Sequence, residues 1–483
     1  MQRTSIQRII GILLMIFSLT MLPPVLVSLI YDDGALIAFL TAFAVIYLTG
    51  LVIWLPVRGE RRELRLRDGF VIVAAFWSVL SLSGALPFMI AEHPHLHFTD
   101  AVFESVSGFT TTGATIIASG LDTLPHSIIY HRAQLQWLGG MGIIVLAVAI
   151  LPMLGVGGMQ LFRAETPGPM KDNKLTPRVT ETAKALWYVY LAITLACAAA
   201  YGAAGMNAFD AITHSYSTVA IGGFSSHDAS IGYFNSITIE LIAVFFMLLS
   251  GMNFALHFLA WRHRSLRPYR DSELYLFLTV MLGGVLIVAV YLYAGNVYAE
   301  PLTALRNAMF HVVSVGTTTG FVTTGFAQWP GFLPVLILMI SFIGGCAGST
   351  GGGLKVIRFM LLIRQGLREI RRMVHPNAQM PVKVNRKVVP ELVVQAVWGF
   401  FSLYVGSFLL IFLVLLGTGM DQVSAWSAVA SCMNNTGPGL GAVTMHYADA
   451  SVTAKWALSF AMLLGRLELF PILVLMAPAF WRN

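Results

Sequence analysis

Long runs of apolar residues dominate this chain of 483 residues and determine the environment in which it can fold. A helix needs about 20 apolar residues to cross a bilayer. The sequence is 57% hydrophobic and only 11% charged, whereas ordinary soluble domains carry about 25% charged residues. These features predict a membrane protein with ten spans, the eighth run being too long for one helix. The runs lie at 9–30, 36–57, 70–91, 134–157, 183–204, 236–259, 274–294, 332–363, 392–416 and 455–480.

Positive charge in the loops predicts the orientation of these spans. Arginine and lysine cluster in segments 58–68, 261–270 and 364–387, and the N-terminus carries two more arginines. Cytoplasmic loops are enriched in these residues, so we expect these segments and both termini in the cytoplasm. The net charge of +7 is largely this topology signal. Membrane lipid is therefore the expected surrounding, and no nucleic-acid partner is predicted.

A glycine-containing loop recurs four times in positions that align without gaps. A serine stands six residues before each glycine and an alanine stands twelve residues before it. The position thirteen residues before holds Asp, Asn or Ser, which commonly cap helix N-termini. Each copy therefore predicts a short helix that begins at this cap on the outer side and ends just before its glycine. The four anchor glycines are Gly113, Gly223, Gly320 and Gly437, and the predicted caps are Asp100, Asp210, Asn307 and Ser424.

Each short helix is flanked by two predicted spans, which defines the expected fold. We predict an all-α membrane protein with two N-terminal transmembrane helices, followed by four pseudo-symmetric repeats of span, pore helix, loop and span around a central pore. Irregular backbone at membrane depth must be surrounded by protein or by a water-filled path, which places the four loops at the axis. The N-terminal pair occupies 1–67, and the repeats occupy 68–160, 161–262, 263–375 and 376–483.

The four loops have the composition of a cation site. Glycine permits backbone torsions that point successive carbonyls one way, and threonine adds hydroxyl oxygens, so that a loop can replace a hydration shell. The C-terminal ends of the short helices add partial negative charge. The alternative is that these glycines serve close helix packing, but four gapless copies favour the pore. The predicted ion-binding residues are Thr111, Thr112, Gly113, Ala220, Ile221, Gly222, Gly223, Thr318, Thr319, Gly320, Asn435, Thr436 and Gly437.

The eighth apolar run is interrupted by GGCAGSTGGG at 344–353, in which six of ten residues are glycine. Each glycine disfavours a helix by about 1 kcal/mol relative to alanine, so we predict a flexible hinge loop beneath the four anchor loops. A phosphate-binding loop is the alternative, but the pattern G-x-x-x-x-G-K-[ST] is not matched.

Arg466 lies inside the last predicted span, about 16 Å along the helix from its start. A charge at this depth is costly unless it faces water or a partner. We expect Arg466 to face the cavity below the loops and to repel cations, with a structural salt bridge to a neighbouring helix as the alternative. Glu468 is not the expected partner, because residues two apart point to different sides of a helix.

The position nine residues before the anchors holds polar side chains in three of the four copies. Glu104, His214 and His311 occupy it, and Ala428 occupies it in the fourth copy. These residues form either a pH-sensitive ring or a polar layer that packs behind the loops. The pattern gives no ground for proton coupling.

Over essentially its whole length the chain resembles the Trk, Ktr and HKT superfamily of potassium transporters, whose members carry four pore repeats with one filter glycine each. The two additional N-terminal spans are similar to those of the bacterial Trk membrane subunit. By this resemblance the four anchors are filter glycines. Sodium-preferring plant members have serine at the first anchor, so Gly113 implies potassium. The second and fourth loops, VAIGGFS and NNTGPGL, depart from the TTTG of the others.

The resemblance also implies how the pore is controlled. It implies a homodimer, a cytosolic ring of regulatory subunits that bind NAD, ATP or ADP, and a location in the bacterial inner membrane. The transported ion is potassium, and no covalently bound cofactor is expected. The hinge loop corresponds to an intramembrane gate, and a basic residue stands at Arg466 in the family. The implied gate residues are Gly344, Gly345, Gly348, Ser349, Thr350, Gly351, Gly352, Gly353 and Lys355.

The predicted function is therefore potassium uptake through a gated, channel-like pore, without enzymatic activity. A proton- or sodium-coupled secondary transporter is the alternative, but such proteins are commonly built from inverted repeats, whereas these four copies share one orientation. A subunit of a pump would need a relay of intramembrane carboxylates, and only Glu468 is clearly placed in the middle of a span. No catalytic constellation is visible at a specific spacing.

Overall fold

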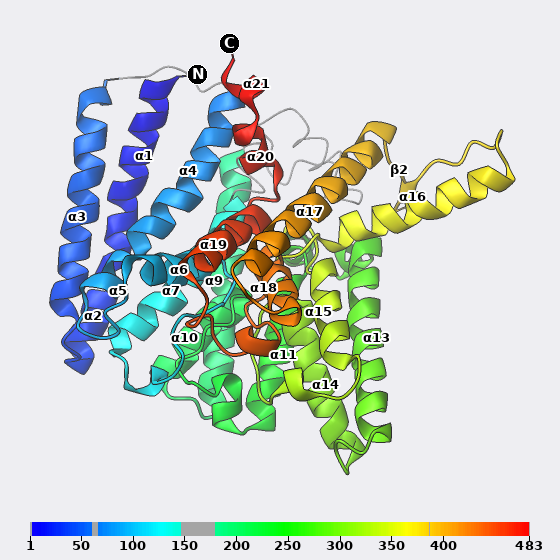
Figure 1. The fold of residues 1–483 in the computed structure, drawn as a ribbon, viewed down its shortest axis with the longest axis horizontal. Helices are drawn as coiled ribbons and strands as arrows, with labels where there is room; N and C mark the ends of the chain where they lie inside the picture. Colours follow the sequence, from blue (N-terminus) through cyan, green and yellow to red (C-terminus); the bar gives the residue numbers. More distant parts are fainter. Residues whose placement is uncertain (1, 60–65, 146–178, 386, 483) are drawn as a thin grey trace.

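The computed structural model describes residues 2–59, 66–145, 179–385 and 387–482, and this part of the chain is mostly helical (Figure 1). Six helical segments are long and apolar enough to cross a membrane, and two further pairs pass the same test although they bend by 91° and 118°. The prediction of membrane-spanning helices is thus supported. The predicted span 134–157 lies partly outside the described residues, as does the predicted repeat boundary at 160.

The N-terminal helices form a layer at one side of the molecule (Figure 1). Two of them, α1 (Arg3–Ser18) and α3 (Leu36–Trp54), approach closely at two glycines. A Cβ atom at Gly11 would lie 2.8 Å from the carbonyl oxygen of Gly50, and a Cβ atom at Gly50 would lie 2.8 Å from the carbonyl oxygen of Gly11. Small residues of this kind allow membrane helices to pack backbone against backbone. The elements are α1 (Arg3–Ser18), η1 (Leu19–Met21), α2 (Leu22–Tyr31), α3 (Leu36–Trp54) and η2 (Leu55–Val57).

The next two groups of helices each place one short helix between longer ones. The first group is α4 (Leu66–Gly84), α5 (Leu86–Ile90), the short α6 (Phe98–Phe109), η3 (Leu121–Thr123) and α7 (His126–Val145). The second is α9 (Val179–Ala203), the short α10 (Ala208–Val219), η6 (Ser230–Phe234), and the bent pair α11 (Ile237–Gly251) and α12 (Phe254–His263).

The third and fourth groups follow the same order. The third is η7 (Arg267–Tyr269), α13 (Ser272–Ala294), the short α14 (Pro301–Gly316), η8 (Phe326–Gln328), α15 (Leu333–Ile343) and α16 (Val356–Val374). A small antiparallel pair, β1 (Lys383–Val384) and β2 (Lys387–Val388), connects to the fourth group. That group is α17 (Glu391–Gly417), the short α18 (Gln422–Asn434), η9 (Gly441–Val443), α19 (Val452–Arg466), α20 (Phe470–Met476) and α21 (Pro478–Trp481).

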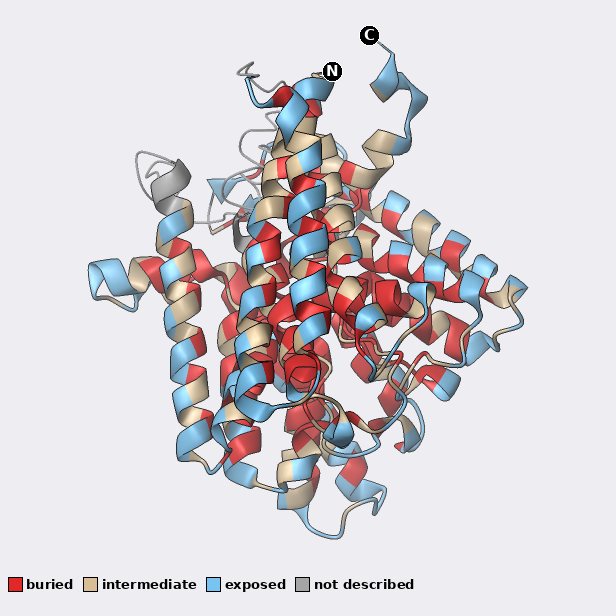
Figure 2. Ribbon diagram, turned by 90° about the vertical axis from the view of Figure 1, so that its left-hand side faces the viewer, coloured by how far each residue is buried: buried red, intermediate tan, exposed pale blue. Residues whose placement is uncertain are grey.

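The burial pattern is that of a protein surrounded by lipid (Figure 2). The long outer helices expose large apolar side chains such as Ile37 (74%), Val52 (70%) and Leu410 (64%). In contrast, every residue of α18 from Ala428 to Asn434 is buried. The short helices therefore lie in the interior, where the apolar outer helices separate them from the surrounding hydrocarbon.

The four predicted N-cap positions were wrong by one turn or more. The caps are His97, Asn207, Glu300 and Asp421. In two copies a capping side chain stands three residues before the predicted one: the Asn207 side chain accepts from the backbone N–H of Asp210, and Asp421 accepts from that of Ser424. The third helix begins at a proline, whose fixed φ favours the first helical position. The predicted residues lie within the helices. Asp100, Asp210 and Ser424 are in the first turn, where the helix dipole favours the two aspartates.

The break predicted within the eighth apolar run is present. Helix α15 ends at Ile343 and α16 begins at Val356, so that 344–355 is not helical. Helix α16 projects away from the bundle (Figure 1). It exposes Ile370, Met373 and Val374 beside several arginines. The N-terminal end of α1 and the C-terminal α21 lie at the same end of the molecule (Figure 1).

Candidate ion-conducting site

The four anchor loops adopt the same backbone conformation immediately after their short helices. In each loop φ is positive at the anchor glycine and at the residue two positions before it, but not at the residue between them. Alternation in the sign of φ allows successive carbonyls to face the same side of such a segment. The pairs of positive φ angles are 53° and 80° at Thr111 and Gly113, 56° and 79° at Ile221 and Gly223, 72° and 85° at Thr318 and Gly320, and 55° and 95° at Asn435 and Gly437.

The four loops pack against one another in a closed ring. At each anchor glycine a Cβ atom would collide with a carbonyl oxygen of the next loop, and the fourth loop returns to the first. Real Cβ atoms essentially never approach closer than 3.0 Å, so only glycine fits. The pairs are Gly113 with Gly222 (2.2 Å), Gly223 with Thr319 (2.0 Å), Gly320 with Thr436 (2.1 Å) and Gly437 with Thr112 (2.7 Å).

One hydrogen bond, repeated in every copy, sets where each short helix ends. The backbone N–H of the residue before each anchor donates to the carbonyl of the recurrent serine six residues before the anchor. This bond places the loop at the same height on each helix end. The four bonds are Thr112 to Ser107 (2.8 Å), Gly222 to Ser217 (2.8 Å), Thr319 to Ser314 (2.7 Å) and Thr436 to Ser431 (2.9 Å).

Two amide side chains, one on α7 and one in the fourth loop, add hydrogen bonds to the ring. Gln136 on α7 donates its amide to the carbonyl of Gly222 (2.6 Å) and accepts from the N–H of Phe224 (3.1 Å). The Asn435 amide donates to the Thr112 hydroxyl at 2.9 Å, which joins the fourth loop to the first. Sequence reasoning missed Gln136. Its only signal in the sequence is an amide side chain within a mainly apolar run.

All four anchor glycines line one cavity of about 90 Å³, which we call the mouth cavity. Its wall also includes Arg132, His227 and Asp228. Its wall contains the anchor glycine of every loop, and the cavity therefore adjoins all four anchor loops.

The polar residues nine positions before the anchors each support their own loop. Glu104 accepts from the N–H of Ile116 at 2.8 Å, and His214 Nε2 contacts the Ser225 hydroxyl at 2.9 Å. His311 Nε2 contacts the carbonyl of Thr324 at 3.1 Å. These contacts support the packing hypothesis rather than a ring of interacting titratable groups.

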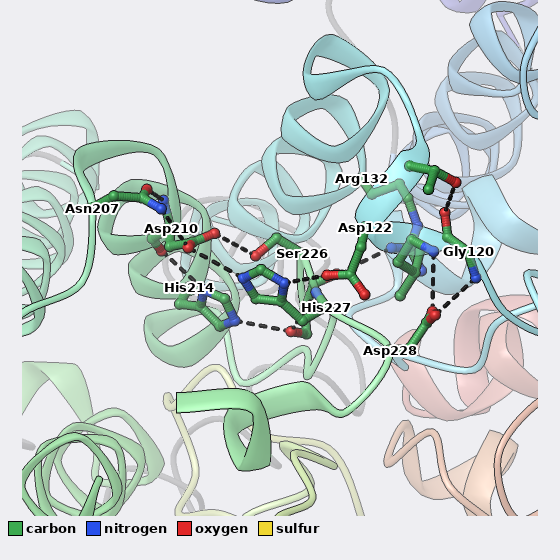
Figure 3. A network of polar contacts seen from close by, with 12 residues as sticks. Gly120, Asp122, Arg132, Asn207, Asp210, His214, Ser226, His227 and Asp228 are labelled. Carbon is green, nitrogen blue, oxygen red and sulfur yellow. Dashed lines mark hydrogen bonds and ion pairs between the residues drawn. The ribbon is translucent and has the colours of Figure 1, made fainter. Parts of the chain in front are cut away.

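A polar network braces the outer loops of the first two groups beside the mouth cavity (Figure 3). The His227 ring lies between two carboxylates, contacting Asp122 through Nδ1 and Asp210 through Nε2, the latter at 3.2 Å. Asp228 accepts from the backbone N–H groups of Gly120 (2.8 Å) and Leu121 (3.0 Å). Burial opposes protonation, but the hydrogen bonds to Asp210 and Asp122 outweigh it and raise the pKa of His227 above 6.5.

The hinge loop lies against the ends of three short helices. The hydroxyl of Thr350 donates to the carbonyl of Val219 at 3.0 Å, and the N–H of Gly353 donates to that of Asn434 at 3.1 Å. The N–H of Gly352 donates to the Thr318 hydroxyl at 2.7 Å. The loop thus hydrogen-bonds to the second, third and fourth copies at or just after the ends of their short helices.

The remaining predicted gate residues complete the compact turn of this loop. Positive φ angles at Gly344 (68°), Gly348 (72°) and Gly353 (75°) explain three of the glycines. A Cβ atom at Gly345 would lie 2.6 Å from the Ser349 hydroxyl. The Lys355 ammonium donates to the carbonyl of Gly351, so this buried charge closes the end of the loop.

Arg466 reaches the hinge loop from the end of α19. Its side chain is 1% exposed, and it donates to the carbonyls of Thr350 (2.9 Å) and Gly139 (3.4 Å). Glu468 instead pairs with Arg358 at 2.5 Å. Arg466 thus contacts backbone carbonyls, and Glu468 pairs elsewhere as expected. The expected reason was wrong, because α19 ends at Arg466 and Glu468 lies beyond the helix with φ 53°.

Comparison with known proteins connects this geometry to a family. A family model described as a cation transport protein, TrkH, matches residues 35–483. The chain is 56% identical to the Trk system potassium uptake protein TrkH of Halomonas elongata, with both chains covered completely. It is 55% identical to the protein of that name from Escherichia coli K12, over 99% of each chain.

A solved structure agrees with these sequence relatives. The crystal structure of the potassium transporter TrkH from Vibrio parahaemolyticus superposes with a TM-score of 0.92 at 53% identity, covering 100% of both chains. The sequence and the fold of this chain therefore resemble the same family over the full length. The chain belongs to the TrkH family of cation transport proteins.

Proposed function

We propose that this protein takes up potassium across the bacterial inner membrane through a gated, channel-like pore, and that it is not an enzyme. The closed ring of four anchor glycines carries this proposal, because it brings the oxygen-rich backbone of four loops to one axis. The potassium-uptake names of relatives at 55–56% identity support the choice of ion. Segments 68–160, 161–262, 263–375 and 376–483 are then pseudo-symmetric pore repeats.

The conduction step follows from the conformation of the loops. A potassium ion in the mouth cavity exchanges its water for oxygens of the thirteen predicted filter residues, whose alternating backbone torsions point carbonyls to one side. The C-terminal ends of α6, α10, α14 and α18 add negative potential where the ion is dehydrated. The ring glycines leave no room for side chains that would change the spacing between loops.

The gating step assigns a role to the hinge loop and to Arg466. With the contacts described above, the loop occupies the inner exit, so an open state requires the hydrogen bonds of Thr350, Gly352 and Gly353 to break. Arg466 adds a positive charge at the same level and disfavours a cation there. Both termini and the arginine-rich loops are assigned to the cytoplasm. A homodimer with a cytosolic nucleotide-binding ring acting on the hinge loop completes the proposal.

The test is flux through the purified chain in liposomes. Rubidium or potassium uptake is measured with a potassium gradient alone, for the wild type and for Gly113→Ser, whose new Cβ would meet the Gly222 carbonyl at 2.2 Å. Gly283→Ser is the matched control, because a Cβ atom at Gly283 meets nothing within 4 Å. We expect gradient-driven flux, with preference over sodium lost only in Gly113→Ser.

The alternative of a coupled secondary transporter predicts a different result. Flux would then require a proton or sodium gradient even when the potassium gradient is large. That outcome would overturn the channel-like mechanism. The four loops would then be interpreted as the ion-binding site of an alternating-access transporter. If the Gly113→Ser and Gly283→Ser variants prefer potassium over sodium to the same extent, Gly113 is not part of the filter.

A further inference from the structure

A positively charged side chain lines the mouth cavity of a site proposed to conduct cations. Arg132 on α7 is 1% exposed and contributes to the same cavity wall as the four anchor glycines. A guanidinium stays protonated in proteins, so its charge raises the energy of a nearby cation unless another charge balances it. The groups around Arg132 must therefore both fix the position of its side chain and balance its charge.

Glu104 on the short helix α6 supplies the balancing charge. Its carboxylate is 0% exposed and accepts from Arg132 Nε at 2.8 Å. The same carboxylate accepts from the Ile116 N–H at 2.8 Å and from the Thr115 hydroxyl at 3.0 Å. Glu104 thus holds both the arginine and the strand that leaves the first anchor loop.

Arg132 extends this support to the second anchor loop. One terminal nitrogen donates to the Thr115 hydroxyl at 3.2 Å, and the other donates to the carbonyl of Ser225 at 3.3 Å. Its guanidinium also lies 4.2 Å from the centre of the Phe224 ring. Ser225 and Phe224 directly follow Gly223, so this one side chain ties the outer ends of the first two loops together.

We propose that Glu104 and Arg132 form a positioning pair that fixes the spacing of the first two filter loops, and that Glu104 cancels the charge which Arg132 would otherwise present to entering cations. The inference rests on the proposed potassium pore. In the second and third copies the equivalent residues, His214 and His311, are not carboxylates, and their hydrogen bonds go to residues of their own copies. The junction between the first two loops is therefore where a charge pair controls selectivity.

The experiment compares Glu104→Gln, Arg132→Gln and the double variant by rubidium and sodium uptake into liposomes. Glu104→Gln leaves the guanidinium unbalanced at the mouth, so the cation concentration for half-maximal uptake should rise about tenfold. The double variant removes both charges, so this concentration should return to within about threefold of wild type. Preference for rubidium over sodium should fall in all three variants, because the tie between the loops is lost.

A purely structural role predicts another pattern, in which the double variant is as impaired as the worse single variant. An unchanged half-maximal concentration in Glu104→Gln would also overturn the proposal. Because Glu104→Gln can fail to fold, Glu104→Asp is measured too; it keeps the charge and should lose preference without the tenfold rise. If the half-maximal concentration rises as much in Glu104→Asp as in Glu104→Gln, the charge argument is refuted.

A second ion pair provides the matched control. Arg306 and Glu240 join α14 to α11 at 2.6 Å, and neither lines the mouth cavity. Glu240→Gln with Arg306→Gln should leave both the half-maximal concentration and the ion preference unchanged. If the wild type itself shows no potassium-driven, selective flux, the proposed function fails. If it does and Glu104→Gln behaves like this control, only the present inference fails.

Discussion

The ring of anchor glycines predicts a specific penalty for a single methyl group at Gly223. This residue has φ +79°, and a Cβ atom there would lie 2.0 Å from the carbonyl oxygen of Thr319. The left-handed conformation costs a non-glycine residue roughly 1–2 kcal/mol. Removing the collision requires the backbone to move, which costs about 1–3 kcal/mol in a packed interior. We therefore expect Gly223→Ala to destabilise the protein by about 2–5 kcal/mol.

Gly34 isolates the first of these two contributions. Its φ of +77° is nearly the same, but a Cβ atom there meets nothing within 4 Å. Gly34→Ala should thus lower the free energy of unfolding by only about 1–2 kcal/mol and leave flux unchanged. The difference between the two variants measures the collision with the neighbouring loop.

The assay combines denaturant unfolding in mixed detergent micelles with ion flux in liposomes. Gly223→Ala should lose about 1–3 kcal/mol more than Gly34→Ala and should lose preference for rubidium over sodium, because the Thr319 carbonyl is displaced. Equal destabilisation of the two variants, together with unchanged ion preference in Gly223→Ala, would refute the reasoning that the ring is closed at this point.

Three further perturbations test the surroundings of the ring. Replacing Arg466 by alanine should raise flux severalfold at a fixed potassium gradient, since a charge below the filter is removed; an unchanged rate would exclude its proposed role. Gln136→Leu should cost about 1–3 kcal/mol of stability, because a buried carbonyl and a buried N–H lose their partner, whereas retention of full stability would contradict that account. His227→Gln should destabilise the protein only where wild-type His227 is protonated. Contacts with Asp122 and Asp210 raise the pKa of His227, so its stabilisation is complete below about pH 6.5 and is lost as the pH rises through the raised value. Thermal unfolding across this range would show a constant difference if the histidine did not titrate.

Features that depend on local sequence were predictable. Glycine at 344–353 disfavours a helix wherever it occurs, and the break between Ile343 and Val356 is observed. The ends of the short helices were also close to the prediction, since each stops three or four residues before its anchor. The predicted beginnings were misplaced because competing capping residues, such as Asn207 and Asp421, stand three residues earlier. Asn, Asp and Ser cap helices about equally well, so residue type alone does not decide between the two positions.

Features that depend on distant contacts were not predictable. The sequence gives no sign that Arg132 meets Glu104, which is 28 residues away, or that Gln136 contacts Gly222, which is 86 residues away. The pairing of Arg358 with Glu468 spans 110 residues. In each case a polar residue within an apolar run indicates an interior partner, but only the packing of the helices determines which partner it meets.

Arg466 differs from three other buried cations of the described chain in the groups that it contacts. Arg132, Arg358 and Lys455 each pair with a carboxylate. The hydrogen bonds of Arg466 instead go to backbone carbonyls, the shorter of them to Thr350 of the hinge loop. When the loop moves, the guanidinium loses that carbonyl and must find water or another oxygen, because an unsatisfied buried charge is strongly unfavourable. In the proposed gating step, opening the exit and relocating the Arg466 charge are therefore parts of one transition, so Arg466→Ala should ease movement of the loop as well as passage of the ion.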